Sequence, residues 1–298
     1  MLTELIALPG GDFRMGSADF YPDEAPVHTA TVAAFAIERH PVTNAQYAEF
    51  VADTGYVTVA ERPLDPALYP GVAAADLLPG ALVFVPTAGP VDLNDWRQWW
   101  DWAPGACWRH PFGRASGIED RLDHPVVQVA YPDAHAYAQW AGRRLPTEAE
   151  WEYACRAGTD TPFAFGADVS LAQVNVDGNR PYAGGRKGEY RQRTVPVKAL
   201  PANGWGLYQM HGNVWEWCAD VPRLYADVQD PATATKNPVG PPNPNQEALR
   251  TLRGGSWFPP AWAARSAYRN VIPRGFRSME LGFRFALRST GPGGAGSR

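Results

Sequence analysis

Cysteine is scarce in this chain of 298 residues, which contains only Cys107, Cys155 and Cys218. Three thiols so far apart in sequence cannot build the disulfide framework of a small secreted protein or a closely spaced zinc site. The chain also lacks an apolar run of the roughly 20 residues that cross a bilayer, and residues 1–20 do not follow the order of a signal peptide. These absences predict free thiols, a cytoplasmic location and no membrane partner.

Helical periodicity is also rare, and it is confined to the first half of the chain. Thr43–Gln46 and Thr147–Glu150 read as capping boxes that each begin a helix, and a further helix is expected over about 132–141. After Gly158 the pattern predicts short strands and long loops. Glycine and proline, 29 of each, are spread without a period, which excludes collagen and favours a loop-rich globular domain.

Positive charge is concentrated near the C-terminus although the whole chain has a net charge of −4. Residues 250–288 contain eight arginines and a single acid, Glu280. Such a segment could bind an anionic or nucleic-acid ligand, or its guanidinium groups could bind carbonyls and carboxylates inside a compact core. We expect the second arrangement and no nucleic-acid partner.

Tryptophan is clustered between residues 96 and 108, where five of the twelve tryptophans occur. A cluster of this kind either forms a lid over a binding groove or fills a small separate core beneath a long loop. The sequence leaves both possibilities open.

Six motifs together resemble the formylglycine-generating enzyme (sulfatase-modifying factor) family over about residues 4–288. In chain order they are Pro9–Ser17, His40–Asn44, Arg144–Glu152, Gly212–Trp217, Arg253–Trp257 and Leu281–Arg284. The resemblance implies one irregular, loop-rich α+β domain with a C-type-lectin-like core over residues 1–288, followed by a disordered tail at 289–298.

The resemblance also implies a chemistry. The enzymes of that family oxidise a sulfatase cysteine to formylglycine with oxygen, and they bind copper(I) through two cysteines that follow a Gly-Gly-Ser motif. This chain has Pro259 and Ala264 at those two positions. Neither side chain can ligate a soft metal ion, so the prediction is no copper and no copper-dependent formylglycine formation.

Two calcium sites can be transferred from the family by position, and all their ligands are oxygen atoms. The first set resembles the side chains of Asn175 and Glu189 with the carbonyls of Val176 and Arg191. The second set resembles the side chains of Gln209 and Glu216 with the carbonyls of Gly212 and Val214. In the alternative interpretation, Glu216 holds its loop by accepting hydrogen bonds.

The C-terminal segment is similar to the variable proteins of diversity-generating retroelements, in which a fixed frame alternates with diversified positions on a lectin-type scaffold. The side chains of such a face would bind a protein or peptide ligand. The predicted binding face comprises Phe258, Pro259, Pro260, Trp262, Ala263, Tyr268, Asn270, Val271, Ile272, Arg274, Phe276, Ser278, Met279 and Glu280.

Three functions are compatible with these observations. The first is a monomeric, non-catalytic ligand-binding protein with the binding face described above and no catalytic residues. The second is an oxidoreductase of the same family that has a non-cysteine active site in the groove where the family's enzymes bind copper. The third is a formylglycine-generating enzyme with relocated thiols. Because both cysteine positions are substituted, we expect the first.

Overall fold

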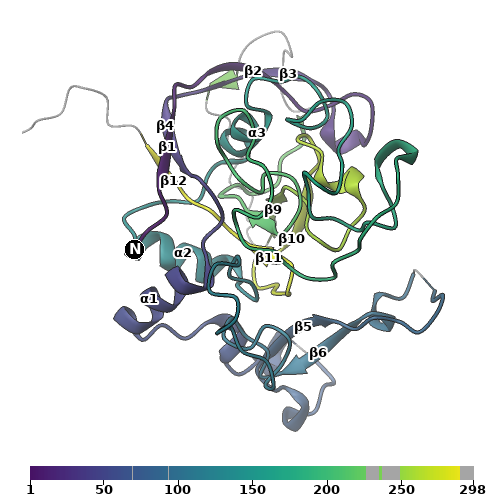
Figure 1. The fold of residues 1–298 in the computed structure, drawn as a ribbon. Coiled ribbons are helices and arrows are strands. Elements are labelled where there is room, and N and C mark those ends of the chain that lie inside the picture. The colour runs from purple at the N-terminus through teal and green to yellow at the C-terminus, as the bar shows by residue number, and fades with distance from the viewer. Residues whose placement is uncertain (69, 93, 226–234, 237–248, 289–298) are drawn as a thin grey trace, which may run out of the picture.

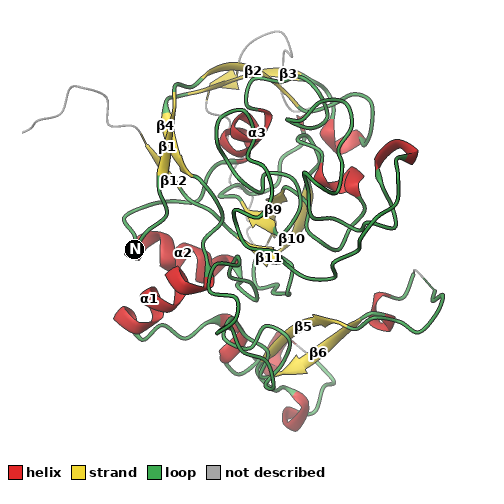
Figure 2. Cartoon of the chain, viewed as in Figure 1, coloured by secondary structure: helices red, strands yellow, loops and turns green. Residues whose placement is uncertain are grey.

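Most of the described chain forms short strands and long loops (Figure 2). The computed structural model describes residues 1–68, 70–92, 94–225, 235–236 and 249–288, so the predicted tail at 289–298 lies outside the described residues. The α-helices are α1 (Asn44–Thr54), α2 (Tyr131–Trp140) and α3 (Glu148–Arg156). The strands are β1 (Leu5–Leu8), β2 (Gly11–Met15), β3 (His28–Val32), β4 (Phe35–Glu38), β5 (Gly80–Phe84), β6 (Trp100–Pro104), β7 (Trp215–Trp217), β8 (Thr235–Lys236), β9 (Leu249–Arg253), β10 (Asn270–Pro273), β11 (Leu281–Gly282) and β12 (Ala286–Arg288).

The predicted helix starts are confirmed. The Thr43 hydroxyl accepts a hydrogen bond from the Gln46 N–H (3.3 Å), and the Gln46 side chain accepts one from the Thr43 N–H (2.9 Å), which caps α1. The same reciprocal pair between Thr147 and Glu150 caps α3. In the described ranges no helix has both the length and the apolar character of a bilayer-crossing segment.

The described residues form four small sheets, most of which join distant parts of the chain (Figure 1). β4 lies between β1 and β12, so the last described strand pairs with the N-terminal region. Another sheet has the order β2-β3-β8, and a third has the order β10-β9-β7-β11, in which β11 is parallel to β7. β5 and β6 form a separate antiparallel pair that stands apart from the other strands in Figure 1. The third sheet positions the residues that precede β11 beside those that precede β7.

Aromatic rings fill the core around α1 and α2. Tyr137 stacks on Phe285 with ring centroids 5.2 Å apart, and on Tyr47 with centroids 5.8 Å apart. Trp108 is buried in the same core against Tyr47. A second core surrounds α3 and includes the buried Trp151. The C-terminal strands therefore complete cores that the N-terminal helices begin.

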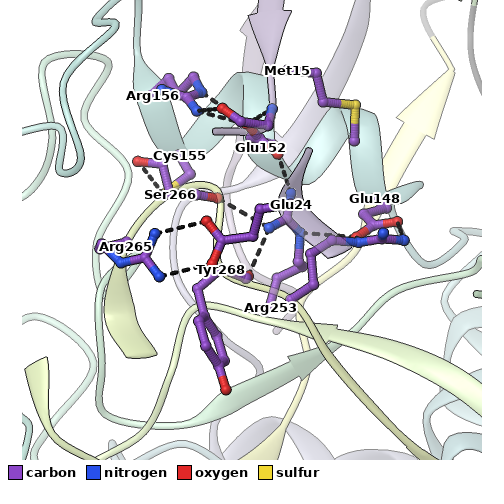
Figure 3. A network of polar contacts seen from close by, with 12 residues as sticks. Met15, Glu24, Glu148, Glu152, Cys155, Arg156, Arg253, Arg265, Ser266 and Tyr268 are labelled. Carbon is purple, nitrogen blue, oxygen red and sulfur yellow. Dashed lines mark hydrogen bonds and ion pairs between the residues drawn. The ribbon is translucent and has the colours of Figure 1, made fainter. Parts of the chain in front are cut away.

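Most arginines of the C-terminal segment are buried inside the domain. The buried ones are Arg253, Arg265, Arg269, Arg277 and Arg284. Arg253 reaches Glu148 and Glu152 on α3, and Arg265 makes two hydrogen bonds of 2.7 Å to Glu24 (Figure 3). Bidentate guanidinium–carboxylate pairs are geometrically demanding, so they fix the positions of the segments that they join. The expectation that these arginines bind carbonyls and carboxylates within the fold is confirmed.

We predict that the Arg265–Glu24 pair is a strong stability determinant. Arg265→Met leaves the Glu24 carboxylate buried without its cation, which should lower the free energy of unfolding by about 3–5 kcal/mol. The double variant Arg265→Met, Glu24→Gln should recover much of that loss, because no buried charge remains. Urea denaturation measures both values, and equal losses in the single and double variants would contradict the prediction.

Candidate active site

Two consecutive glycines let the chain after β9 pack closely against a neighbouring segment. Gly254 and Gly255 have φ values of 96° and 71°, a region that L-residues with side chains rarely adopt. A Cβ on Gly255 would lie 2.9 Å from the carbonyl oxygen of Ala263. The turn therefore lies directly against Ala263 and Ala264, and Ser256 follows it.

Ser256 and Glu280, which are 24 residues apart, form a hydroxyl–carboxyl pair at the end of this turn. The Ser256 hydroxyl donates to the Glu280 carboxyl and accepts a hydrogen bond of 3.2 Å from the Phe258 N–H. The Glu280 carbonyl accepts from the Trp215 N–H at 2.8 Å, which fixes the second segment. Ser256 is fully buried, whereas Glu280 keeps partial exposure. Backbone hydrogen bonds therefore hold the pair on both sides.

The Glu280 carboxyl has no cationic partner among the described residues, unlike the carboxylates that bind the buried arginines. Burial raises its pKa to about 7, and the hydrogen bond from Ser256 offsets only part of this rise. Burial together with the charges of Asp177 and Glu280 also raises the pKa of Tyr190. A carboxyl group with a pKa close to neutrality can both accept and donate a proton, which makes Glu280 a candidate acid–base group.

The tryptophan-rich segment covers one side of this pair. Phe84 of β5 and Trp100 of β6 contact the Phe258 ring, with centroids 5.1 Å and 5.2 Å away, and Phe84 also contacts Trp257. Trp108, by contrast, belongs to the main core. Trp108 therefore does not belong to a small separate core, and Trp100 packs on Phe258 without lining the groove.

A cavity of about 870 Å³, which we call the groove, adjoins the pair. Its volume falls in the usual range of ligand-binding pockets. Met279, the neighbour of Glu280, lines the groove together with Phe84, and its sulfur accepts a hydrogen bond of 3.1 Å from the Phe84 N–H. The remaining lining residues are Pro86, Phe112, Arg121, His124 and 189–196.

The two positions that the family resemblance assigns to copper-binding cysteines follow the same turn. The Pro259 carbonyl accepts a hydrogen bond of 3.1 Å from the Asp177 N–H. Ala264 is buried, and its carbonyl accepts one of 2.7 Å from His211 Nδ1. Neither side chain offers a thiolate or any other ligand atom, so the residues present do not fit a copper(I) ion at these positions.

The cysteines that the chain does contain are free and buried. Cys155 Sγ lies 3.6 Å from His211 Nε2, but burial raises the pKa of Cys155 to about 12 and lowers the pKa of His211 to about 4. The pair therefore stays neutral, and Cys155 is not a reactive thiolate. In the described ranges no group of three or more His, Cys, Asp or Glu side chains could hold a metal ion. The structure thus provides no support for relocated thiols.

The fourteen side chains of the predicted binding face lie at different depths. The buried ones are Ala263, Ser278 and Met279; the exposed ones are Trp262, Val271 and Arg274; Phe258, Pro259, Pro260, Tyr268, Asn270, Ile272, Phe276 and Glu280 are partly buried. Phe258, Met279 and Glu280 meet near the groove. Trp262 and Tyr268 instead form a separate aromatic group with Tyr21.

The two predicted calcium sets lie next to each other. Gly212 meets Asn175 so closely that a Cβ would be 2.4 Å from the Asn175 carbonyl oxygen, which only glycine at its φ of 84° permits. The side-chain oxygens of Asn175 and Gln209 are buried and have no hydrogen-bond partner. The Glu216 carboxylate receives hydrogen bonds from Arg284 and Trp151 instead. Each set therefore offers one buried amide oxygen that lacks a partner.

The remaining members of the two sets differ in exposure. Val176, Gly212 and Val214 are buried, whereas the side chain of Glu189 is 73% exposed. The Glu189 carboxylate lies 3.6 Å from the Arg191 guanidinium. Glu189 is therefore free to reorient toward a cation, at the cost of a weak surface ion pair.

Sequence reasoning misses Ser256, Tyr190 and Phe84 as members of this site. They come from three separate segments, and no local pattern connects them. A signal for Glu280 does exist, because it is the single acid in a segment with eight arginines. A lone acid that is left unpaired among many cations is a candidate for a special role.

Comparison with known proteins corrects the expected function. A formylglycine-generating enzyme from Mycobacterium tuberculosis is 62% identical over 86% of this chain and 87% of its own length. An inactive Cα-formylglycine-generating enzyme 2 from Mus musculus is 33% identical over 97% of this chain and 87% of its own length. The much higher identity to an active enzyme overturns the expectation of a non-catalytic binding protein. The presence of Pro259 and Ala264 at the two expected cysteine positions was not sufficient evidence for a non-catalytic protein.

Structural comparison agrees with the predicted fold class, a mixed α and β domain with few helices. The structure of PvdO from Pseudomonas aeruginosa superimposes with a TM-score of 0.65 at 28% identity, and the match covers 96% of this chain and 95% of PvdO. The sulfatase-modifying factor enzyme 1-like domain family matches residues 1–289. A match over nearly the whole chain, together with the 62% identical relative, shows that this protein belongs to the sulfatase-modifying factor enzyme 1-like family.

Proposed function

We propose that the chain is an enzyme of the formylglycine-generating type, an oxidoreductase that modifies a cysteine side chain in a polypeptide. The single observation that supports an active site here is the Glu280 carboxyl, which is held by Ser256 and lacks a cation. Groups of this kind are concentrated at active sites, because their pKa values are adjusted to transfer protons. The 62% identical formylglycine-generating enzyme supports the reaction type.

The proposed role of Glu280 is to take the proton of the substrate side chain. The S–H bond of a cysteine breaks, an O–H bond forms on the Glu280 carboxyl, and a thiolate remains. An ordinary glutamate is too weak a base to deprotonate a thiol efficiently. The raised pKa of Glu280 lies closer to the pKa of a cysteine thiol, so the proton transfer becomes less unfavourable. Ser256 orients the carboxyl, and Phe84 with Trp100 shields the site from bulk water.

Calcium is proposed as a structural ion for the two sets of oxygen ligands. The unpartnered amide oxygens of Asn175 and Gln209 are what hard cations bind, and neighbouring carbonyls can complete a ligand shell. Asn175, Val176, Glu189 and Arg191 would hold one ion; Gln209, Gly212, Val214 and Glu216 would hold the other. Bound calcium would stabilise the loops that carry the groove and would take no part in proton transfer.

The first prediction concerns activity. Purified protein should convert the cysteine of a Cys-x-Pro-x-Arg or Cys-x-Pro-x-Glu peptide to an aldehyde in the presence of oxygen, as detected by mass spectrometry after hydrazide labelling. Glu280→Gln should lower the rate roughly a hundredfold or more, because the proton acceptor is lost. The matched control Glu119→Gln, at an exposed position, should keep the rate. The absence of aldehyde from both peptides would contradict the proposed function.

The second prediction concerns stability against pH. Glu280 binds its proton more tightly in the folded state than in the unfolded chain, where its pKa is near 4.5, so this residue lowers stability as pH rises from about 4.5 to about 7. Each pKa unit corresponds to about 1.4 kcal/mol, which limits the effect to about 3 kcal/mol. Relative to the wild type, Glu280→Gln should therefore gain stability over this pH range, and Glu119→Gln should not. A pH-independent difference would argue against an isolated carboxyl.

The third prediction concerns calcium. The melting temperature should be higher in excess calcium than with a chelator, and the difference should grow with free calcium by mass action. Asn175→Leu and Gln209→Leu should each remove part of that difference, and the double variant should remove all of it. Differential scanning calorimetry measures these values. Identical wild-type melting curves with calcium and with chelator would instead favour the role of Glu216 as a hydrogen-bond acceptor.

A further inference from the structure

The groove beside Glu280 has two walls of different chemistry. Phe84, Pro86 and Phe112 give one wall an apolar, ring-lined surface. Residues 189–196 form the other wall, with polar and charged side chains. Met279, the residue before Glu280, lines the groove, so a polypeptide that presents a side chain to Glu280 would continue along it.

The charge of the groove is positive. Arg121, Arg191 and Arg193 line it, against the single acid Glu189. His124 adds little positive charge near neutral pH, because burial lowers its pKa below 6.5. The groove therefore carries an excess of cations, while the whole chain is negative.

The three guanidinium groups differ in how completely they are satisfied. Arg121 bonds the adjacent Asp120 at 2.9 Å and lies over the Phe112 ring. Arg191 Nη2 donates to the Leu171 carbonyl at 3.2 Å, but its buried Nη1 has no partner. The Arg193 side chain is exposed and makes one weak bond, 3.4 Å from Nε to the Arg191 carbonyl. In the described ranges Arg193 pairs with no carboxylate.

Unsatisfied guanidinium nitrogens beside aromatic rings favour a particular ligand. Arginine binds carboxylates in a bidentate manner, and the gain is larger where neighbouring apolar groups exclude water. A segment with a basic residue at this place would instead face like charges, which costs binding free energy. The groove thus discriminates between acidic and basic residues that flank the modified side chain.

We infer that the groove lined by Arg121, Arg191 and Arg193 selects polypeptide substrates with an Asp or Glu residue within a few residues of the side chain presented to Glu280. This inference rests on the proposed function, because that function makes the bound polypeptide a substrate. The recognition itself is a binding property that can be measured without turnover. It assigns the specificity of this chain to the 189–196 wall of the groove.

Fluorescence anisotropy with labelled peptides tests the inference without any requirement for turnover. The probes are a Cys-x-Pro-x-Glu peptide, its Cys-x-Pro-x-Gln counterpart and the Cys-x-Pro-x-Arg peptide. The Glu peptide should bind roughly fivefold tighter than the Gln peptide, and the Arg peptide should bind most weakly. Raising the salt concentration should reduce this preference.

A charge reversal localises the effect. Arg193→Glu should weaken binding of the Glu peptide roughly fivefold and should improve binding of the Arg peptide. Arg186→Glu is the matched control, since Arg186 is an exposed residue of the same loop that does not line the groove. Both variants change the net charge equally, so a long-range charge effect would appear in both.

The outcomes separate the inference from the proposed function. Preferential binding of the Glu peptide without any aldehyde supports the inference and contradicts the proposed function. Aldehyde formation with equal affinity for the three peptides supports the proposed function and contradicts the inference. Equal losses in Arg193→Glu and Arg186→Glu, or tighter binding of a thymidine oligonucleotide than of the Glu peptide, would overturn the assignment of this wall to acidic polypeptides.

Discussion

Buried guanidinium–carboxylate pairs hold the C-terminal segment against the rest of the domain, and the position of the candidate active site depends on them. Arg253 and Arg269 bind the acids of α3, and Arg284 binds Glu216 with two hydrogen bonds of 2.7 Å. The ion pairs fix the course of this segment, and they hold Ser256, in the loop after β9, close to Glu280, in the turn before β11.

The sequence predicts the local features of this fold well. Capping boxes depend on residues three positions apart, so the helices at Asn44 and Glu148 could be located from the chain alone. The burial of the arginines followed from their number and from the lack of nearby acids in the same segment. The Ser256–Glu280 pair could not be predicted, because it depends on the parallel alignment of β11 with β7 and on which carboxylates the arginines leave unpaired.

The error in the functional expectation has a physical origin. Pro259 and Ala264 show which ligand atoms are missing, but they do not show what the surrounding residues provide. The chemistry of a site depends on the burial and charge of groups such as Glu280, and these quantities exist only in the folded chain. Ser256 lies in the turn that leads to Pro259 and Ala264, the two positions to which the family resemblance assigns cysteines.

The pairing of β12 with β4 has a consequence for how the protein forms in the cell. Arg265 and Glu24 are 241 residues apart, and the strand that closes the N-terminal sheet is synthesised long after its partner β4. A nascent chain on the ribosome therefore carries Glu24 without its cation and aromatic surfaces without their cover until the segment from Arg265 to β12 has been made. Contacts this distant in sequence also slow folding. Until β12 pairs with β4, the segments made earlier are therefore prone to aggregation.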